Sequence, residues 1–156
     1  MSDTLLATGS PVPNLSLTNQ DGESVNLADM KGQKLIVYFY PKDNSGSCVK
    51  EAESLRDGYA DLKAQGYEVI GVSPDSEKSH RNFITKRELP FTLISDPEHK
   101  LTEAFGAWGE KKMYGKTYMG LLRSTFLVDE NGVISHVIPK VKTKAHATQI
   151  LDLLQN

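Results

Sequence analysis

The strongest constraint on the fold is a run of strand-forming residues that ends at a proline. Residues Lys34–Tyr40 read KLIVYFY, and an unbroken run of β-branched and aromatic side chains is typical of a strand buried on both faces. Pro41 has no backbone N–H to give to a neighbouring strand, so the strand must stop there. The sequence therefore predicts a central sheet strand with other elements packed on both of its faces.

A helix is predicted soon after this strand, and it carries the only cysteine of the chain. Apolar side chains recur there at intervals of three and four residues, while charged side chains fall mostly elsewhere; the apolar set is Cys48, Ala52, Leu55, Tyr59 and Leu62. Cys48 then lies in the first turn, just after residues that commonly cap helices, namely Asn44, Ser45 and Ser47. The free N–H groups of a first turn and the helix dipole favour a thiolate over a thiol. We therefore predict a reactive cysteine rather than a space-filling one.

The following segments extend this unit into an α/β domain. Gly66 sits where the helix should end, and Tyr67–Ser73 reads as a second interior strand, so strand, helix and strand form a parallel crossover. The later predicted elements are a helix at Glu77–Arg87, a strand at Phe91–Ile94, a short helix at Glu98–Phe105, strands at Arg123–Val128 and Val133–Ile138, and a helix at Lys142–Leu154. The two later strands flank a turn at Asp129–Gly132 and should pair antiparallel.

Two regions lie outside this pattern. Short strands at Leu15–Leu17 and Ser24–Asn26 flank a tight turn, which indicates an N-terminal β-hairpin appended to the main sheet. Gly106–Gly120 is glycine-rich and is interpreted as a loop, whose large side chains either pack it onto the body or form a wall near the site; they are Trp108, Met113, Tyr114 and Tyr118. A reactive cysteine at a helix start after a central strand resembles the thioredoxin arrangement. We therefore expect one α/β domain over residues 1–156, with a thioredoxin-like fold, a mixed central sheet flanked by helices and an N-terminal hairpin.

Composition narrows the class of partner. The 18 basic and 20 acidic residues give a net charge of −2, without a basic block, so neither nucleic acid nor a membrane surface is expected as a partner. The chain has no apolar run near the roughly 18 residues that a membrane span needs and no secretory leader pattern at its start. One unpaired cysteine suits a reducing compartment, so the cytoplasm is the expected location.

Other familiar chemistry lacks a matching pattern. His80, His99, His136 and His146 are scattered without the spacing of a metal site, so we interpret them as surface residues and expect no metal. The glycine-rich motifs that bind nucleotides are missing as well, so no cofactor is expected.

The segment Tyr38–Glu51, YFYPKDNSGSCVKE, resembles the active-site segment of peroxiredoxins of the bacterioferritin-comigratory, or peroxiredoxin Q, group. The family pattern is P-x-x-x-[TS]-x-x-C, often with Glu three residues on, and the matching residues are Pro41, Ser45, Cys48 and Glu51. Similarity continues through GVSPDS at Gly71–Ser76, SDP at Ser95–Pro97, KKMYGK at Lys111–Lys116 and RSTFLVD at Arg123–Asp129. The chain departs from the family in having Ser45-Gly46-Ser47 where Thr-Pro-Gly or Thr-Ser-Gly is usual.

The resemblance implies a thiol peroxidase of the thioredoxin-dependent type. Cys48 would be the nucleophile that attacks hydrogen peroxide or an alkyl hydroperoxide and becomes a sulfenic acid. Ser45 and Arg123 would stabilise the reacting oxygens, Pro41 would shape the turn, and Glu51 and Tyr40 would support the site. From the residues alone, Arg123 could equally be a surface residue at a strand edge.

The resemblance also shows what this chain lacks. The family's resolving cysteine commonly lies five residues after the reactive one, where this chain has Glu53, or in the next long helix, where it has Ile84. An outside thiol must then reset Cys48, from thioredoxin, glutaredoxin or glutathione, and we expect a monomer or weak homodimer. Two alternatives stay open: a cysteine hydrolase that pairs Cys48 with a histidine, and a thioredoxin-like redox-sensing or binding module. Peroxide consumption separates the three.

Overall fold

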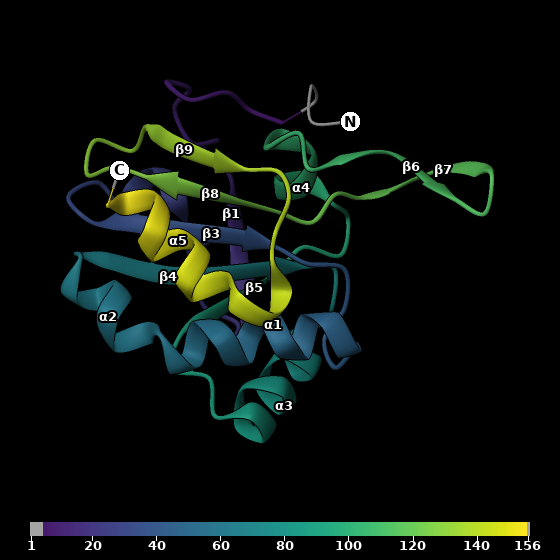
Figure 1. The fold of residues 1–156 in the computed structure, drawn as a ribbon, viewed down its shortest axis with the longest axis horizontal. Helices are drawn as coiled ribbons and strands as arrows, with labels where there is room; N and C mark the ends of the chain where they lie inside the picture. The colour runs from purple at the N-terminus through teal and green to yellow at the C-terminus, as the bar shows by residue number, and fades with distance from the viewer. Residues whose placement is uncertain (1–4, 156) are drawn as a thin grey trace.

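The predicted buried strand is β3 (Lys34–Phe39), and it lies inside a seven-stranded sheet (Figure 1). The computed structural model describes residues 5–155, without the side chain of Met113. The sheet has the strand order β2-β1-β5-β4-β3-β8-β9, and its other strands are β1 (Ser16–Asn19), β2 (Ser24–Asn26), β4 (Tyr67–Ser73), β5 (Thr92–Ser95), β8 (Ser124–Val128) and β9 (Ile134–Ile138). Strands β3, β4 and β5 are mutually parallel, whereas β8 runs antiparallel to β3. The mixed sheet of a thioredoxin-like fold is therefore confirmed.

Successive residues of β3 supply two separate apolar cores, as a strand covered on both faces requires. Ile36 and Tyr38, together with Tyr40 just after the strand, point into a core that also holds Cys48. The helices whose side chains fill that core are α1 (Gly46–Asp57), α2 (Tyr59–Ala64), α3 (Glu77–Arg87) and α5 (His146–Leu154). The residues between them in β3 face a second core under α4 (Lys100–Ala104). The cysteine thus lies on the side of the sheet that carries most of the helices.

The N-terminal hairpin is part of the main sheet rather than an appendage. Strands β1 and β2 pair antiparallel as predicted, and β1 then pairs with β5, with Thr18 opposite Ser95. The hairpin therefore extends the sheet beyond β5. Its signal in the sequence was local, whereas the pairing with β5 joins residues far apart in the chain.

The interpretation of residues 106–120 as a loop was wrong. Strands β6 (Trp108–Met113) and β7 (Lys116–Leu121) form a two-stranded hairpin that projects from the body (Figure 1). Its two turn residues, Tyr114 and Gly115, both have positive φ, at 52° and 77°, as a tight hairpin turn requires. Tyrosine is uncommon at such a φ, so the turn residues do not indicate a hairpin. Because β7 is largely exposed, the strand also lacks the apolar alternation from which it could be predicted.

The large side chains of that hairpin behave differently from one another. Trp108 packs on the second core and stacks on His99, with ring centroids 4.1 Å apart. Tyr114 is 97% exposed and Tyr118 is 42% exposed, so packing onto the body, expected for them, does not occur. The side chain of Met113 lies outside the described part of the chain.

The cysteine helix is shorter than predicted because the chain breaks at Gly58 into α1 and α2. A side chain at this position would collide with its neighbour, since a Cβ on Gly58 would lie 2.4 Å from the Cβ of Ala147. The final helix also starts late: a 3-10 turn at Thr143–Ala145 precedes α5. The break and the late start together let the beginning of α5 pack closely against the end of α1.

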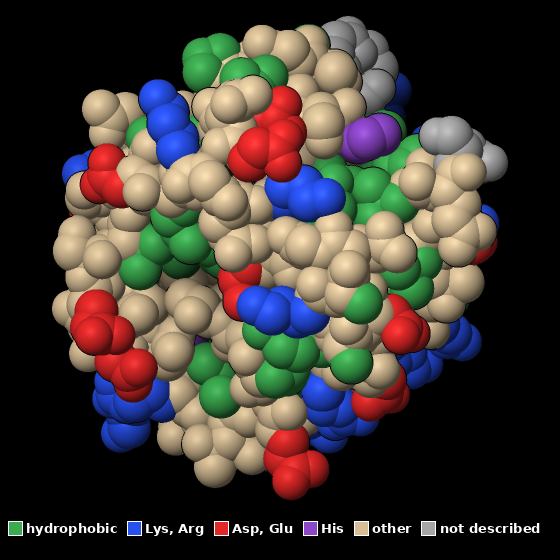
Figure 2. Space-filling model, turned by 90° about the vertical axis from the view of Figure 1, so that its left-hand side faces the viewer, with side chains coloured by type: hydrophobic (Ala, Val, Ile, Leu, Met, Phe, Trp, Pro, Cys, Tyr) green, Lys and Arg blue, Asp and Glu red, His purple; other side chains and the backbone are tan. Residues whose placement is uncertain are grey.

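The surface shows no concentration of one charge on the face drawn in Figure 2, where acidic and basic side chains are interspersed. Among the described residues, no helix is long and apolar enough to cross a membrane.

Candidate active site

Cys48 lies in the first turn of α1, as predicted, and its side chain is only 1% exposed. The buried stripe of this helix consists of Cys48, Glu51, Ala52 and Leu55, at intervals of three, one and three residues. A carboxyl group therefore occupies the inner face of the helix, one turn from the sulfur. A buried carboxyl needs a partner.

Arg123 is that partner and also contacts the cysteine. It precedes β8, which lies beside β3 in the sheet, and its guanidinium reaches over to α1. Nη2 donates to Cys48 Sγ at 3.2 Å, and Nη1 donates to Glu51 Oε1 at 2.5 Å. The structure thus brings together three residues that the sequence predicted for the site, and it removes the interpretation of Arg123 as a plain surface residue.

Glu51 is fully buried and incompletely paired. Burial raises its pKa from 4.5 to about 7, although the positive charge of Arg123 and its hydrogen bond act in the opposite direction. Its second oxygen, Oε2, lies 3.6 Å from His146 Nε2. Burial also lowers the pKa of His146 to about 4, so this imidazole is neutral near pH 7.

Pro41 and Ser45 stand in the loop between β3 and α1, which makes a sharp turn at Asn44, with φ of 64°. Ser45 is the N-cap residue, and its carbonyl accepts from Val49 N at 2.9 Å. Its hydroxyl makes no capping bond to the helix, contrary to the prediction that side chains would cap this end. This hydroxyl, three residues before Cys48, is therefore not engaged in capping the helix.

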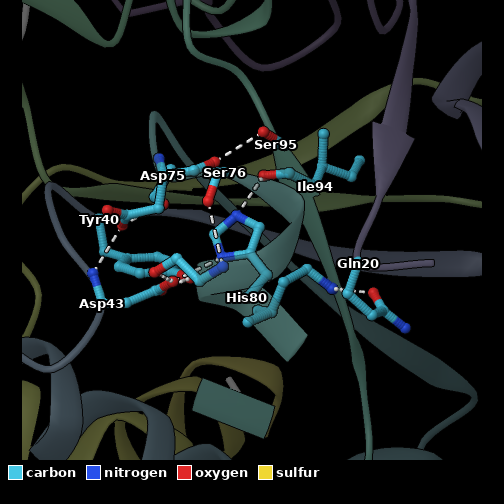
Figure 3. A network of polar contacts seen from close by, with 11 residues as sticks. Gln20, Tyr40, Asp43, Asp75, Ser76, His80, Ile94 and Ser95 are labelled. Carbon is cyan, nitrogen blue, oxygen red and sulfur yellow. Dashed lines mark hydrogen bonds and ion pairs between the residues drawn. The ribbon is translucent and has the colours of Figure 1, made fainter. Parts of the chain in front are cut away.

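Asp43 anchors this loop to the rest of the protein (Figure 3). Its side chain is buried, and it accepts hydrogen bonds from Tyr40 OH at 2.7 Å and from Ser79 Oγ at 2.8 Å. His80 Nδ1 lies 2.8 Å from the same carboxylate, and its Nε2 donates to Ile94 O at 3.0 Å. The side chains of Tyr40, Ser79 and His80 thus converge on the Asp43 carboxyl group.

Asp75 extends this network from the end of β4. It accepts from Asp43 N at 2.6 Å and from Ser73 Oγ at 2.8 Å. Asp43, Asp75 and His80 place possible metal ligand atoms within 4.8 Å of one another, but hydrogen bonds within the protein already occupy those side chains. The cluster holds the loop between β3 and α1 in place.

The prediction that all four histidines are surface residues was wrong for His80 and His146, which are both fully buried. Sequence reasoning assigned Tyr40 a supporting role but missed Asp43, His80 and His146. Asp43 follows Pro41 within the motif, which could have drawn attention to it. The two histidines carry no local signal, since their acidic partners are 37 and 95 residues away.

The two positions expected for a resolving cysteine have other roles. Glu53 lies on the partly exposed side of α1, at 3.8 Å from both Arg56 and Arg87. Ile84, on α3, packs against the core that holds Cys48. Cys48 is a free cysteine in the structure.

Comparison with known proteins agrees with this geometry. The sequence profile described as the AhpC/TSA family matches residues 8–137. The chain belongs to the AhpC/TSA family. Within it, the chain is similar to peroxiredoxin Bcp of Escherichia coli K12, with 45% identity over 96% of each chain, and to peroxiredoxin Bcp of Bacillus subtilis 168, with 45% identity over 95% of this chain and 94% of that protein.

Solved structures place this AhpC/TSA protein in the same group. The bacterioferritin comigratory protein of Xanthomonas campestris, studied for its alkyl peroxide reduction activity, superposes with a TM-score of 0.87 at 35% identity, covering 96% of this chain and 98% of that one. The protein is thus a peroxiredoxin of the bacterioferritin-comigratory group, as its active-site segment suggested, and it has the thioredoxin-like fold of that group.

Proposed function

We propose that Cys48 is the peroxidatic nucleophile of a thiol peroxidase that reduces hydrogen peroxide and alkyl hydroperoxides in the cytoplasm. The observation that carries the assignment is the hydrogen bond of 3.2 Å from Arg123 to Cys48 Sγ, in a first helical turn that excludes bulk water. A guanidinium and free N–H groups stabilise a thiolate there. The same groups stabilise negative charge on a peroxide oxygen as the O–O bond breaks.

The chemical step uses the residues of this site. The Cys48 thiolate attacks the terminal peroxide oxygen, so an S–O bond forms, the O–O bond breaks and the remaining oxygen leaves as an alkoxide or hydroxide that takes up a proton. Arg123 is assigned to the developing negative charge, and Ser45 to a hydrogen bond with the peroxide. Pro41 and Tyr40 hold the loop that presents Ser45: Pro41 ends the strand, and Tyr40 bonds to Asp43.

A histidine-assisted cysteine hydrolase fits this geometry poorly. Arg123 is the group hydrogen-bonded to Cys48 Sγ among the described residues, while His146 lies beyond Glu51 and His80 bonds to Asp43 and Ile94. A nucleophile–base pair needs the base within hydrogen-bond reach of the sulfur.

An external thiol completes the cycle in this proposal. With Cys48 alone, a disulfide within one chain cannot form, so a thiol of thioredoxin, glutaredoxin or glutathione attacks the sulfenic acid and releases water, and a second thiol then frees Cys48 from the mixed disulfide. A bond between two copies of the chain would require two Cys48 side chains to become exposed at the same time, so we expect a monomer or weak homodimer without a covalent link.

The test is oxidation by one equivalent of peroxide, followed by intact-mass analysis. The wild-type protein should gain one oxygen that dimedone traps, whereas Cys48→Ser should gain none. An unchanged wild-type mass would contradict the peroxidase assignment. A covalent dimer on a non-reducing gel would instead contradict the one-cysteine cycle.

A further inference from the structure

One guanidinium serves two acids in the buried site. Arg123 donates to Cys48 Sγ through Nη2 and to Glu51 Oε1 through Nη1. When Cys48 is a thiolate, its charge already balances the charge of Arg123. An ionised Glu51 would then be a second, uncompensated anion on a fully buried side chain, and such a charge is strongly disfavoured.

The second oxygen of Glu51 has the surroundings of an acid rather than of a carboxylate. Oε2 is buried and accepts no hydrogen bond from any described residue. It faces His146 Nε2 at 3.6 Å. The protonation state of that nitrogen therefore decides what Oε2 meets.

Hydrogen bonds around Gln149 determine the tautomer of His146. Gln149 Oε1 accepts from Lys142 N at 3.0 Å, and Nε2 of the same amide donates to Lys140 O at 2.9 Å, so the orientation of the amide is settled. His146 Nδ1, 3.0 Å from Gln149 Oε1, must therefore carry the ring proton. Nε2 is then bare and accepts from Thr125 Oγ1 at 2.8 Å. Because Thr125 already uses the one lone pair of Nε2, this nitrogen offers Glu51 Oε2 neither an N–H nor a positive charge, and its partial negative charge at 3.6 Å disfavours an ionised Oε2.

The packing of α5 on α1 maintains this contact. The lack of a side chain at Gly58 lets Ala147 approach α1, and Ala147 N donates to Ser54 Oγ at 3.1 Å. His146, the neighbouring residue, is thereby held against the inner face of the cysteine helix.

We propose that Glu51, beside His146, is protonated while Cys48 is a thiolate and loses that proton when Cys48 becomes a sulfenic acid. This inference rests on the function proposed above. The step balances as Cys48-S⁻ + Glu51-COOH + ROOH giving Cys48-SOH + Glu51-COO⁻ + ROH. Once the sulfur is neutral, Arg123 is free to pair fully with the Glu51 carboxylate. Glu51 thus acts through Arg123 as a positioning residue. The proton that it loses balances the proton that the products gain, whichever route that proton takes.

The electrostatics of the surroundings support this assignment. Burial raises the pKa of Glu51 to about 7, and the groups that face it are Cys48 on its own helix, Arg123 before β8, His146 on α5 and Tyr38 on β3. Burial also holds the pKa of Tyr38 well above its usual value, so this phenol stays neutral. Arg123 is then the one cation among these groups near pH 7, because His146 is neutral.

The experiment counts the protons exchanged with solvent during oxidation. Wild type, Glu51→Gln and the control Glu53→Gln, a more exposed carboxyl on the same helix, are mixed with one equivalent of hydrogen peroxide in weak buffer with a pH indicator. The pH is chosen where thiolate absorbance shows Cys48 ionised in all three proteins, and the count is divided by the sulfenic acid found by mass. Oxidation of a thiolate without an internal proton source takes up about one proton.

The expected uptake is near zero for wild type and Glu53→Gln, and about one proton per sulfenic acid for Glu51→Gln. Equal uptake in wild type and Glu51→Gln would overturn the inference while leaving the peroxidase assignment intact; failure to form sulfenic acid would overturn both. An infrared difference spectrum of the wild type gives a second measurement that needs no variant. It should show a protonated-carboxyl band disappearing on oxidation, and an unchanged carboxyl region would overturn the inference.

Discussion

Two buried pairs of an acid and a histidine flank the cysteine helix, and they differ in how completely they are hydrogen-bonded. Asp43 and His80, on the loop before α1 and on α3, use their polar atoms fully: Asp43 accepts from Tyr40 and Ser79, and both ring nitrogens of His80 are engaged. Glu51 on α1 and His146 on α5 are 3.6 Å apart, and Glu51 Oε2 has no hydrogen-bond partner among the residues that the structure describes.

The difference separates two uses of a buried charge. A carboxyl group that three side chains contact acts as an anchor, because moving it breaks several hydrogen bonds at once. A carboxyl with one cation on one oxygen and nothing on the other can exchange its proton at moderate cost. The loop that presents Ser45 is therefore held rigidly, whereas the group behind Arg123 can respond to the charge of the sulfur.

The largest effect on stability should come from disrupting the fully hydrogen-bonded pair, Asp43 and His80. Asp43→Ala leaves His80, Tyr40 and Ser79 with buried unpaired groups, so the free energy of unfolding should fall by about 3–5 kcal/mol, and oxidation of Cys48 should slow as the loop loses its anchor. Denaturant unfolding measures the first effect. Asp57→Ala, at a side chain that is 70% exposed, is the matched control and should change stability by under about 0.5 kcal/mol.

The incompletely hydrogen-bonded pair, Glu51 and His146, should make stability depend on pH. The folded-state pKa of Glu51 is about 7, above its ordinary 4.5, so its contribution to stability is full below pH 4.5 and is lost as pH rises through 7. Glu51→Gln removes this loss, so the variant should gain about 3 kcal/mol relative to wild type between acid and neutral pH. His146 acts in the opposite sense, because its pKa is lowered from 6.5 to about 4 and its contribution is lost as pH falls. The measurement is the free energy of unfolding of wild type and Glu51→Gln as a function of pH. A constant difference between the two proteins from pH 4.5 to pH 7 would contradict the raised pKa of Glu51.

Removing the cation shared by sulfur and carboxyl should affect rate more than stability. Arg123→Met should slow oxidation of Cys48 by roughly 100-fold, because it removes charge stabilisation from the transition state. Stopped-flow kinetics with hydrogen peroxide measures the rate, and circular dichroism checks the fold. Wild-type kinetics in a folded variant would remove Arg123 from the proposed mechanism.

A substitution where α1 contacts α5 should disturb the pair of Glu51 and His146 but not the pair of Asp43 and His80. Gly58→Ala places a Cβ 2.4 Å from the Cβ of Ala147, and neither atom is the flexible end of a side chain, so α5 must shift at a cost of about 1–3 kcal/mol. Thermal or denaturant unfolding measures the loss. Gly46→Ala, on the same helix with open space around its Cβ, should cost far less. Equal losses in the two variants would show that α5 does not require the close approach.

The smallest expected effect is the one on the oxidation rate when the Ser45 hydroxyl, in the loop between β3 and α1, is removed. Ser45→Ala should slow oxidation by about tenfold, the value of one hydrogen bond, and leave stability nearly unchanged because this hydroxyl caps nothing. Ser45→Thr should retain the wild-type rate. A slow Thr variant would mean that the shape of the loop matters there rather than the hydroxyl.

Local signals accounted for most of the fold and for the core of the site. The strand before Pro41, the helix that carries Cys48 and the hairpin of β8 and β9 were each predictable from periodicity and turn residues within a short window. The assignment of Arg123 to the site came from resemblance. The structure adds its contact with Cys48, across 75 residues of sequence.

Features that depend on distant contacts could not be predicted. The cysteine helix breaks at Gly58, where Ala147 packs too closely for a side chain, and no residue near Gly58 indicates that neighbour. The β6–β7 hairpin has an exposed strand and Tyr114 in its turn, so it lacks the alternation and the turn chemistry from which hairpins are recognised. His80 and His146 look like ordinary polar residues until the sheet brings acids beside them.

The break at Gly58 has a consequence for access to the sulfur. In the proposed cycle, an outside thiol has to reach a side chain that is 1% exposed, and we expect the first turn of α1 to unwind before it can attack. Unwinding that begins at Gly46 meets a barrier where Ser54 and Gly58 contact α5, and α2 beyond the break belongs to a separate helical segment. The opening unit is therefore about two turns long, and amide hydrogens ahead of Ser54 should exchange with deuterium as one group, faster than those of α2.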